Sequence, residues 1–255
     1  MKKLKYVNFA LSLCILVFCF LALAFAQDIK EEESFFVAKK AFDDGFYDVS
    51  LGLLDRFLKN YPTSLKRAEA DLLIGECFFR QGKYLEALGK FESLLGNPLA
   101  KDIKDAVLYW IAEVHFKGGT YAKAQQFYKQ IIDDFPRSSY APAAYYSLGW
   151  CLFQEGNFNE ALANFKVVVE KFPADGQAQD SAYKIIECLF NLKEYATAKE
   201  KMKGYLKVYP KDTLRNAYLY FYAAEADYYL NNFQDAIDGY KKVVTLTANA
   251  QLQAI

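Results

Sequence analysis

The segment EGNFNEALANFKVVVEKFP, from Glu155 to Pro173, places an aromatic residue after a glycine turn, an alanine three residues later and a proline at its end. Closely related segments begin at Gln81, Gly118 and Leu192. Their apolar residues recur at three- and four-residue spacing, which predicts amphipathic helices. The proline predicts where each helix ends, because it cannot donate the next helical hydrogen bond. The chain is therefore built from a repeated unit.

The aromatic residue that follows each glycine-containing turn gives the period of the repeat, which is 37 residues with one final step of 38. These aromatic residues are Tyr47, Tyr84, Tyr121, Phe158, Tyr195 and Phe233. Three residues after each of them stands a small side chain, where two helices would approach closely: Ser50, Ala87, Ala124, Ala161, Ala198 and Ala236. Six coincidences in one register indicate an internal repeat.

Each unit divides into two helical patterns joined by the turn. The first pattern, for example APAAYYSLGWCLFQEG from Ala141, ends at the glycine turn, and the second ends at the proline. One such helix pair cannot bury its apolar stripe alone, whereas stacked pairs bury a continuous core between neighbours. The repeat therefore predicts an all-α solenoid.

These residues resemble the tetratricopeptide repeat family, whose helix pairs carry a small residue in the first helix, an aromatic residue after the turn, an alanine, a second aromatic residue and a terminal proline. The features fall on Gly75, Tyr84, Ala87, Phe91 and Pro98 in one unit. In another unit they fall on Gly149, Phe158, Ala161, Phe165 and Pro173. The resemblance covers residues 34–247 in six repeats. It implies a right-handed superhelical solenoid that is not an enzyme and that binds peptides or proteins.

Each unit is about three residues longer than the family's usual period of about 34, and the extra residues follow the proline. This longer spacing is similar to that of periplasmic tetratricopeptide proteins associated with the Tol-Pal system and with outer-membrane assembly. The former usually add an N-terminal coiled coil and the latter a lipid anchor. The sequence shows neither pattern. Lipidation is not expected, because Cys14 follows Leu13 and Cys19 follows Phe18, whereas a lipidation site needs small residues before the cysteine.

Residues 1–26 form a separate segment, in which Lys2, Lys3 and Lys5 precede an uncharged run that ends in a small-residue cleavage pattern at Ala24 and Ala26. The pattern predicts a secretory signal peptide, with an uncleaved signal anchor as the alternative. We therefore expect a periplasmic or otherwise exported protein, or one anchored in the inner membrane and facing the periplasm. Contact with a membrane is expected only if the segment stays uncleaved.

The two ends of the repeat array have their own expectations. Residues 27–33 read as a short acidic lead-in. Residues 248–255 either begin a further repeat or mark a truncated C-terminus. Terminal repeats normally need a polar capping helix, and the sequence shows none at this end, so we expect association through the C-terminal face.

Residues that suggest catalysis or metal binding are explained by the repeat. Cys77, Cys151 and Cys188 occupy one column of the first helices, which predicts buried free thiols rather than disulfides. His115 is the only histidine of the chain and lies in a column of packing residues. We therefore expect no catalytic residues, no metal site and no cofactor.

Basic and acidic side chains balance at 31 each, and removal of residues 1–26 leaves a small negative charge, so nucleic acid is not an expected partner. The resemblance implies that the first helices line a concave face. The predicted partner-binding residues are Tyr109, Glu113, Tyr146, Trp150, Tyr183, Glu187, Phe221 and Glu225. The alternative is that these aromatic residues belong to the core. As alternatives to an independent scaffold, the chain is a subunit of an envelope-assembly machine or the binding region of a longer protein with a downstream catalytic domain.

The N-terminal pattern yields a direct prediction of processing. N-terminal sequencing of exported protein is expected to begin at Gln27, because cleavage follows the small residues at Ala24 and Ala26. Exported protein that still begins at Met1 would indicate the anchor instead. A cytoplasmic product that retains Met1 would contradict export altogether.

Overall fold

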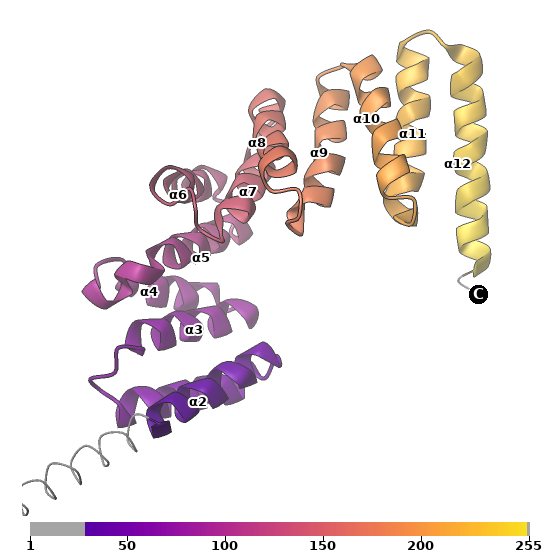
Figure 1. The fold of residues 1–255 in the computed structure, drawn as a ribbon. Helices are drawn as coiled ribbons and strands as arrows, with labels where there is room; N and C mark the ends of the chain where they lie inside the picture. Colours follow the sequence, from indigo (N-terminus) through magenta and orange to yellow (C-terminus); the bar gives the residue numbers. More distant parts are fainter. Residues whose placement is uncertain (1–28, 254–255) are drawn as a thin grey trace, which may run out of the picture. The chain divides into compact units, whose positions relative to one another are not determined.

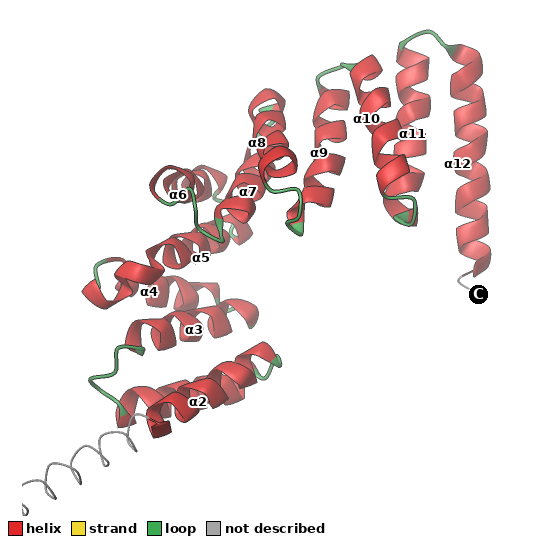
Figure 2. Ribbon diagram, in the orientation of Figure 1, coloured by secondary structure: helices red, strands yellow, loops and turns green. Residues whose placement is uncertain are grey.

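The computed structural model describes residues 29–253, and all regular structure in this range is helical (Figure 2). A first helix covers residues 29–43. It is followed by α2 (Tyr47–Asn60), α3 (Arg67–Arg80), α4 (Tyr84–Leu95), the 3₁₀ helix η1 (Pro98–Ile103), α5 (Lys104–Lys117), α6 (Tyr121–Asp134), α7 (Ala141–Gln154), α8 (Phe158–Lys171), α9 (Gln177–Asn191), α10 (Tyr195–Val208), α11 (Thr213–Tyr229) and α12 (Phe233–Gln253). The prediction of an all-α fold is confirmed.

Two compact units make up the chain, and they divide between Val114 and His115, within α5. In the first unit, α3 packs on α2, α4 and η1. In the second unit each helix from α6 to α12 packs on the next one along the chain (Figure 1). Sequence neighbours are thus the main packing partners, as a solenoid requires.

The predicted period matches the helix boundaries. Each aromatic residue used to define the repeat is the first residue of a second helix: α2, α4, α6, α8, α10 and α12 begin at these six positions. The small residue three positions later is at most 2% exposed in all six pairs. Ser50 carries a hydroxyl into this contact, and its Oγ donates a hydrogen bond to the Ala38 carbonyl at 2.9 Å. The small-residue column is therefore the point of close approach within each pair.

Glycine and phenylalanine form a second close contact inside two of the pairs. A Cβ built on Gly75 would lie 2.4 Å from Phe91 Cε1, and a Cβ on Gly149 would lie 2.8 Å from Phe165 Cε1. Both phenylalanine side chains are fully buried. The ring of the second helix thus lies directly against the backbone of the first, which only glycine permits at this distance.

The turns within the pairs share one backbone geometry, with a residue in the left-handed region at φ between +62° and +81°. Four of these residues are glycines: Gly45, Gly82, Gly119 and Gly156. The expectation of glycine in every turn was wrong for the last two, where Lys193 and Asn231 take the position. The Lys193 N–H still bonds to the Phe190 carbonyl and the Glu194 N–H to the Leu189 carbonyl, at 3.0 and 2.9 Å. This paired C-cap holds Lys193 in a conformation that costs a non-glycine residue about 1 kcal/mol.

The same turn is closed by an aromatic pair in every repeat. An aromatic residue near the end of the first helix packs on the first residue of the second helix, with ring centroids 5.2–5.9 Å apart. The pairs are Phe42–Tyr47, Phe79–Tyr84, Phe116–Tyr121, Phe153–Phe158, Phe190–Tyr195 and Tyr228–Phe233. These aromatic contacts therefore hold the two helices of each pair together at the turn.

Both ends of the described chain are helical. The acidic residues 31–33 lie inside the first described helix. At the other end α12 runs to Gln253, so the described part of residues 248–255 continues this helix. The predicted signal segment, residues 1–26, lies outside the described residues. Within the described residues no helix is both long and apolar enough to cross a membrane.

Substitution of Gly75 tests the close contact. Gly75→Ala is expected to lower the free energy of unfolding by about 1–3 kcal/mol, because the added Cβ overlaps the Phe91 ring. Gly89→Ala is the matched control. Gly89 lies within α4 with open space around its Cβ, so alanine should raise stability by about 0.5–1 kcal/mol.

Urea unfolding of these variants, together with Gly75→Ala in a Phe91→Leu background, measures the contact directly. The smaller Leu side chain should reduce the cost of the added methyl group. An equal loss in both backgrounds would show that the Phe91 ring is not its cause.

Candidate functional site

The predicted binding residues lie on the first helices of the pairs, in couples spaced by four residues that share one helix face. Tyr109 and Glu113 lie on α5 within the first unit. The other six lie in the second unit: Tyr146 and Trp150 on α7, Tyr183 and Glu187 on α9, and Phe221 and Glu225 on α11. The second unit therefore holds most of the predicted site.

Trp150 is the centre of a polar and aromatic cluster on α7 and α9. Its Nε1 donates a hydrogen bond to the Tyr146 hydroxyl at 2.8 Å. From α9, Lys184 Nζ lies 3.8 Å from the centroid of the Trp150 ring and 4.8 Å from that of Phe153. A cation over an indole face is attracted by the ring quadrupole, most strongly where water is excluded. Lys184 therefore joins the two repeats through Trp150.

Glu187 neutralises this lysine. Its Oε2 lies 2.5 Å from Lys184 Nζ, and the two side chains are only 14% and 12% exposed. The Tyr222 hydroxyl, on α11, donates to the other oxygen, Oε1, at 3.5 Å. Burial raises the pKa of Tyr222, and the neighbouring Glu187 charge adds to this shift. Both carboxylate oxygens are thus engaged inside the chain.

Glu225 on α11 has an internal contact of another kind, because its Oε1 accepts a hydrogen bond from the Tyr240 hydroxyl of α12. Burial, followed by the hydrogen bond to Glu225, raises the pKa of Tyr240 to about 12. Lys184 thus compensates the charge of Glu187, whereas the Tyr240 hydroxyl leaves the charge of Glu225 in place.

The two tyrosines of the predicted site that belong to the second unit, Tyr146 and Tyr183, lie between the core and the surface. The Tyr146 ring packs edge-on against Phe165, and the Tyr183 ring packs against Tyr205, at centroid distances of 5.8 and 6.1 Å. Burial is the main reason that the pKa of each is raised. Arg215 lies 5.6 Å from the Tyr183 ring. Each ring therefore packs against the second helix of its own repeat on one side and is half-buried.

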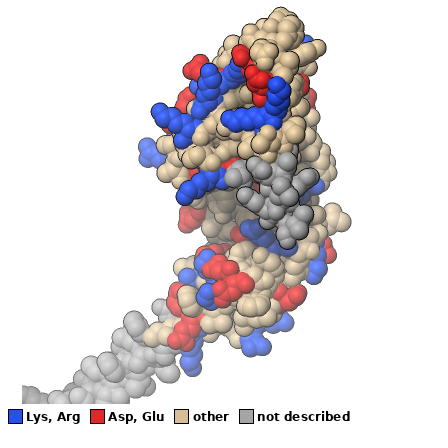
Figure 3. Space-filling view, turned by 90° about the vertical axis from the view of Figure 1, so that its right-hand side faces the viewer, with Lys and Arg blue, Asp and Glu red and all other residues tan. Residues whose placement is uncertain are grey.

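Exposed aromatic residues concentrate on α11, where Phe221 is 42% exposed. Tyr218, Tyr228 and Tyr229 on the same helix are 51–55% exposed. Large aromatic side chains at this exposure are enriched at protein interfaces. The face turned toward the viewer in Figure 3 shows Lys and Arg interspersed with Asp and Glu, with broad uncharged areas between them.

The first unit contains a buried carboxylate that the sequence pattern did not single out. Glu76, on α3, is 9% exposed, and burial raises its pKa to about 7. Arg80, the Trp110 side chain and Lys39 oppose the shift, whereas Asp43 adds to it. Its column position was visible in the sequence, but its burial was not.

Lys184 was also missed, although a signal was available. Its column holds Phe36, Leu73, Trp110, Ser147 and Tyr222 in the other repeats, so Lys184 is its only charged member. Because Lys184 is a charged residue in an otherwise uncharged column next to the column of Trp150, its position indicates a specific contact for the lysine charge.

The prediction that the three cysteines are buried free thiols is confirmed. Cys77, Cys151 and Cys188 are buried free cysteines, and burial raises the pKa of Cys77 to about 11 and of Cys188 to about 12. His115 Nδ1 lies 3.0 Å from Thr120 Oγ1, and its ring stacks on Phe127. Among the described residues no cluster of His, Cys, Asp and Glu could hold a metal ion.

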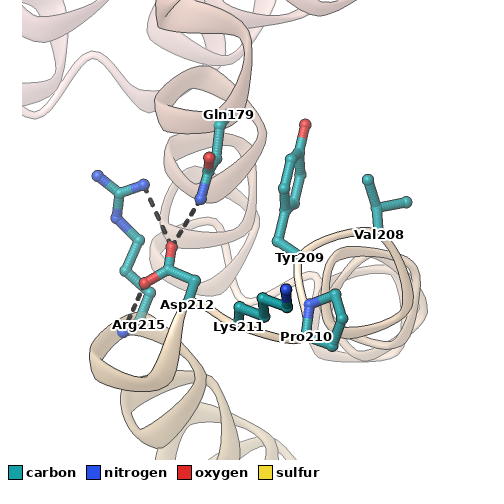
Figure 4. A pocket seen from close by; sticks show the side chains of 7 residues that line it. All are labelled: Gln179, Val208, Tyr209, Pro210, Lys211, Asp212 and Arg215. Atoms are coloured by element: carbon teal, nitrogen blue, oxygen red, sulfur yellow. Dashed lines mark hydrogen bonds and ion pairs between the residues drawn. The ribbon is translucent and has the colours of Figure 1, made fainter.

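A pocket of about 720 Å³ lies beside the loop between α10 and α11 (Figure 4). Asp212 stands at its edge as the N-cap of α11 and accepts hydrogen bonds from Gln179 and the Tyr205 hydroxyl, both at 2.8 Å. Arg215 binds Asp180 at 2.6 Å and lies 3.4 Å from Asp212. Lys211 also lines the pocket. The network fixes the joint between the last two repeats.

Three segments match families described as tetratricopeptide repeat: residues 38–102, 115–185 and 180–212. The C-terminal part of a repeat-containing protein of this type from Cytophaga hutchinsonii is similar at 19% identity and a TM-score of 0.69, over 85% of this chain and 80% of that one. A tetratricopeptide repeat protein from Parabacteroides merdae is similar at 20% identity and a TM-score of 0.61, over 84% of this chain and 79% of that one. MamA from Desulfovibrio magneticus is similar at 18% identity and a TM-score of 0.58, over 71% of this chain and 96% of that one. These likenesses show the fold. No curated protein matches the chain.

Titration of Glu76 gives a prediction for stability. Its pKa is about 7 in the folded chain, against an ordinary value of 4.5, so the carboxyl is protonated in both states below pH 4.5. As the pH rises toward 7, the Glu76 carboxyl ionises freely only in the unfolded state. The free energy of unfolding therefore falls by about 2–3 kcal/mol. Glu76→Gln should remove this component of the pH dependence.

Urea unfolding of both proteins at pH 5 and pH 8 measures the difference. The variant should gain stability relative to the native chain at the higher pH. Glu86→Gln, at an exposed position on α4, is the control for the removal of a surface carboxyl group. A parallel pH dependence of Glu76→Gln and the native chain would contradict the assignment.

Proposed function

The chain belongs to the tetratricopeptide repeat family, and from this premise we propose that it is a non-enzymatic scaffold that binds a protein or peptide through the face of its first helices. Proteins of this family generally act as interaction modules. We further propose that it acts outside the cytoplasm, which is supported by the lysines and the apolar run that precede Ala26.

The observation that carries the proposal is the exposed aromatic surface of α11 beside the Trp150 cluster. Phe221 and Tyr218 are 42% and 55% exposed. Tyr222, between them and the cluster, reaches Glu187. Aromatic side chains anchored by a rigid neighbour lose little freedom on binding, so they contribute strongly to affinity. The partner segment should therefore supply apolar anchors.

Charge plays a smaller part than aromatic contact in this proposal. Glu187 is paired with Lys184, and Glu225 accepts from Tyr240. A basic residue of the partner would have to compete with these internal contacts. The acids should consequently affect the association rate and its salt dependence more than the final affinity.

The test begins with capture of partners from an envelope extract and their identification by mass spectrometry. Binding of the identified partner is then titrated against Phe221→Ala and Tyr218→Ala. Both side chains are exposed, so the variants should keep their helical content and melting temperature. Loss of one interface anchor should weaken binding by about 2 kcal/mol, or roughly 30-fold.

Trp150→Ala is expected to weaken binding as well, and its melting temperature decides how this is interpreted. If it unfolds the second unit, Trp150 belongs to the core and the site is restricted to α11. Phe46→Ala is the matched control, because Phe46 is 62% exposed but lies at the turn before α2. Normal binding by both α11 variants would overturn the assignment of the first-helix face.

A further inference from the structure

Glu225 of α11 lies among exposed aromatic side chains. Phe221 precedes it by one helical turn, and Tyr228 and Tyr229 follow it by one turn, so all four residues share one side of the helix. Phe221 is 42% exposed, Tyr228 54% and Tyr229 51%. From α12, which packs beside α11 (Figure 1), the Tyr240 ring lies 6.1 Å from the Phe221 ring, and its hydroxyl donates to Glu225 Oε1. Aromatic rings from two helices thus flank one carboxylate.

The charge of this carboxylate has no counterpart nearby. Among the side chains that the structure describes, Glu225 forms no ion pair, and Lys199 of the neighbouring α10 binds Asp227 instead. The Tyr240 hydroxyl donates a hydrogen bond but brings no positive charge. It also occupies only one of the two carboxylate oxygens. A cation from outside the chain can therefore approach Glu225 without displacing a lysine or arginine.

The equivalent acid of the preceding repeat shows how this face holds a cation. Glu187 occupies the column of Glu225, and its Oε2 lies 2.5 Å from Lys184 Nζ. The same Nζ lies 3.8 Å from the centroid of the Trp150 ring, so carboxylate and ring attract one ammonium group together. In α11 the position of Lys184 is taken by Tyr222, whose hydroxyl reaches Glu187. The α11 repeat therefore has the acid and the rings but no lysine between them.

This combination selects a basic side chain over other occupants. An acidic group would meet Glu225 with like charge. An apolar side chain would cover the carboxylate without pairing it, which costs free energy. A metal ion would need further ligands, and no cluster of His, Cys, Asp and Glu within the described part of the chain could supply them. The stem of a lysine or arginine, by contrast, packs on aromatic rings while its charged head meets the acid.

The opposite side of the helix pairs shows no such preference. A groove of about 460 Å³ lies there between the second helices α8 and α10. Gly204 opens it, because a Cβ at this position would have no heavy atom within 4 Å. Its charged residues are balanced, with Lys166 and Lys201 against Glu170 and Glu200. The groove therefore serves as the reference surface in the test below.

We propose that Glu225 and the rings of Phe221, Tyr228 and Tyr229 bind a lysine or arginine side chain of the partner protein. This inference rests on the function proposed above and names the kind of side chain that the first-helix face selects. The rings supply most of the contact, and Glu225 makes the site specific for a basic group. Tyr240 holds one carboxylate oxygen, and the other meets the incoming cation.

Fluorescence anisotropy with the full chain tests the proposal. The probe is a fluorescein-labelled peptide in which Lys alternates with Leu and Phe, and its analogue carries Gln at every Lys position. The lysine peptide should bind at least about tenfold more tightly than the analogue, with an affinity that falls as salt rises. Equal binding of the two peptides, or no saturation by the lysine peptide below about 1 mM, would overturn the proposal. This comparison needs no substitution in the chain.

Glu225→Gln removes the charge but keeps an acceptor for the Tyr240 hydroxyl. It should weaken binding of the lysine peptide about fivefold and leave binding of the analogue unchanged. Glu200→Gln is the matched control, because it removes an exposed carboxyl on the other side of the helix pairs. If Glu200→Gln weakens the lysine peptide as much, the peptide responds to net charge alone and the proposal is wrong. Urea unfolding checks that both variants are folded.

Two further variants separate this inference from the function on which it rests. Gly204→Leu fills the groove between α8 and α10 and should change the binding of neither peptide. Phe221→Ala should weaken both peptides, because ring contact does not depend on the charge of the ligand. If both peptides bind equally and both are weakened by Phe221→Ala, the first-helix face stands and only its preference for a basic side chain fails. If Phe221→Ala and Tyr218→Ala leave capture of the natural partner intact, the proposed function itself fails.

Discussion

The structure depends on the close approach of the two helices within each pair. Six small side chains, from Ser50 to Ala236, are buried at this contact. Gly75 and Gly149 let phenylalanine rings of the second helix reach the first-helix backbone. Because this contact sets the distance between the helices, it also sets where the turn residues and the closing aromatic pairs lie. Each pair thereby presents an apolar side to the next pair, and stacking buries it.

Local features of the surface and of the helix contacts arise where one repeat carries a different residue from the others. Trp150, Lys184 and Gly204 each occupy a column in which the other repeats hold residues of another kind, whereas Glu76 shares its column with three other glutamates. The repeated contacts keep the backbone equivalent, so one changed side chain produces a local feature without a change of fold. Such a scaffold acquires a lysine–tryptophan contact or an open groove at separate places.

Charge is distributed differently on the two sides of the helix pairs. On the first-helix side, Glu187 and Glu225 are engaged by Lys184 and Tyr240, which leaves aromatic surface as the main feature. On the second-helix side, lysines and glutamates in equal number line the groove between α8 and α10. Buried pairs on the first side favour a fixed arrangement of the helices.

The sequence by itself determined the period, the starts of the second helices and the free state of the three cysteines, because periodicity, turns and column positions are local properties of the chain. It did not predict that Lys193 and Asn231 would take the left-handed turn positions, since the surrounding hydrogen bonds overcome their preference. Only the tertiary structure decided that Lys184 covers Trp150, that Glu76 is buried and that Gly204 opens a groove. These features depend on the angles and distances between neighbouring helices, which bring together side chains from separate repeats.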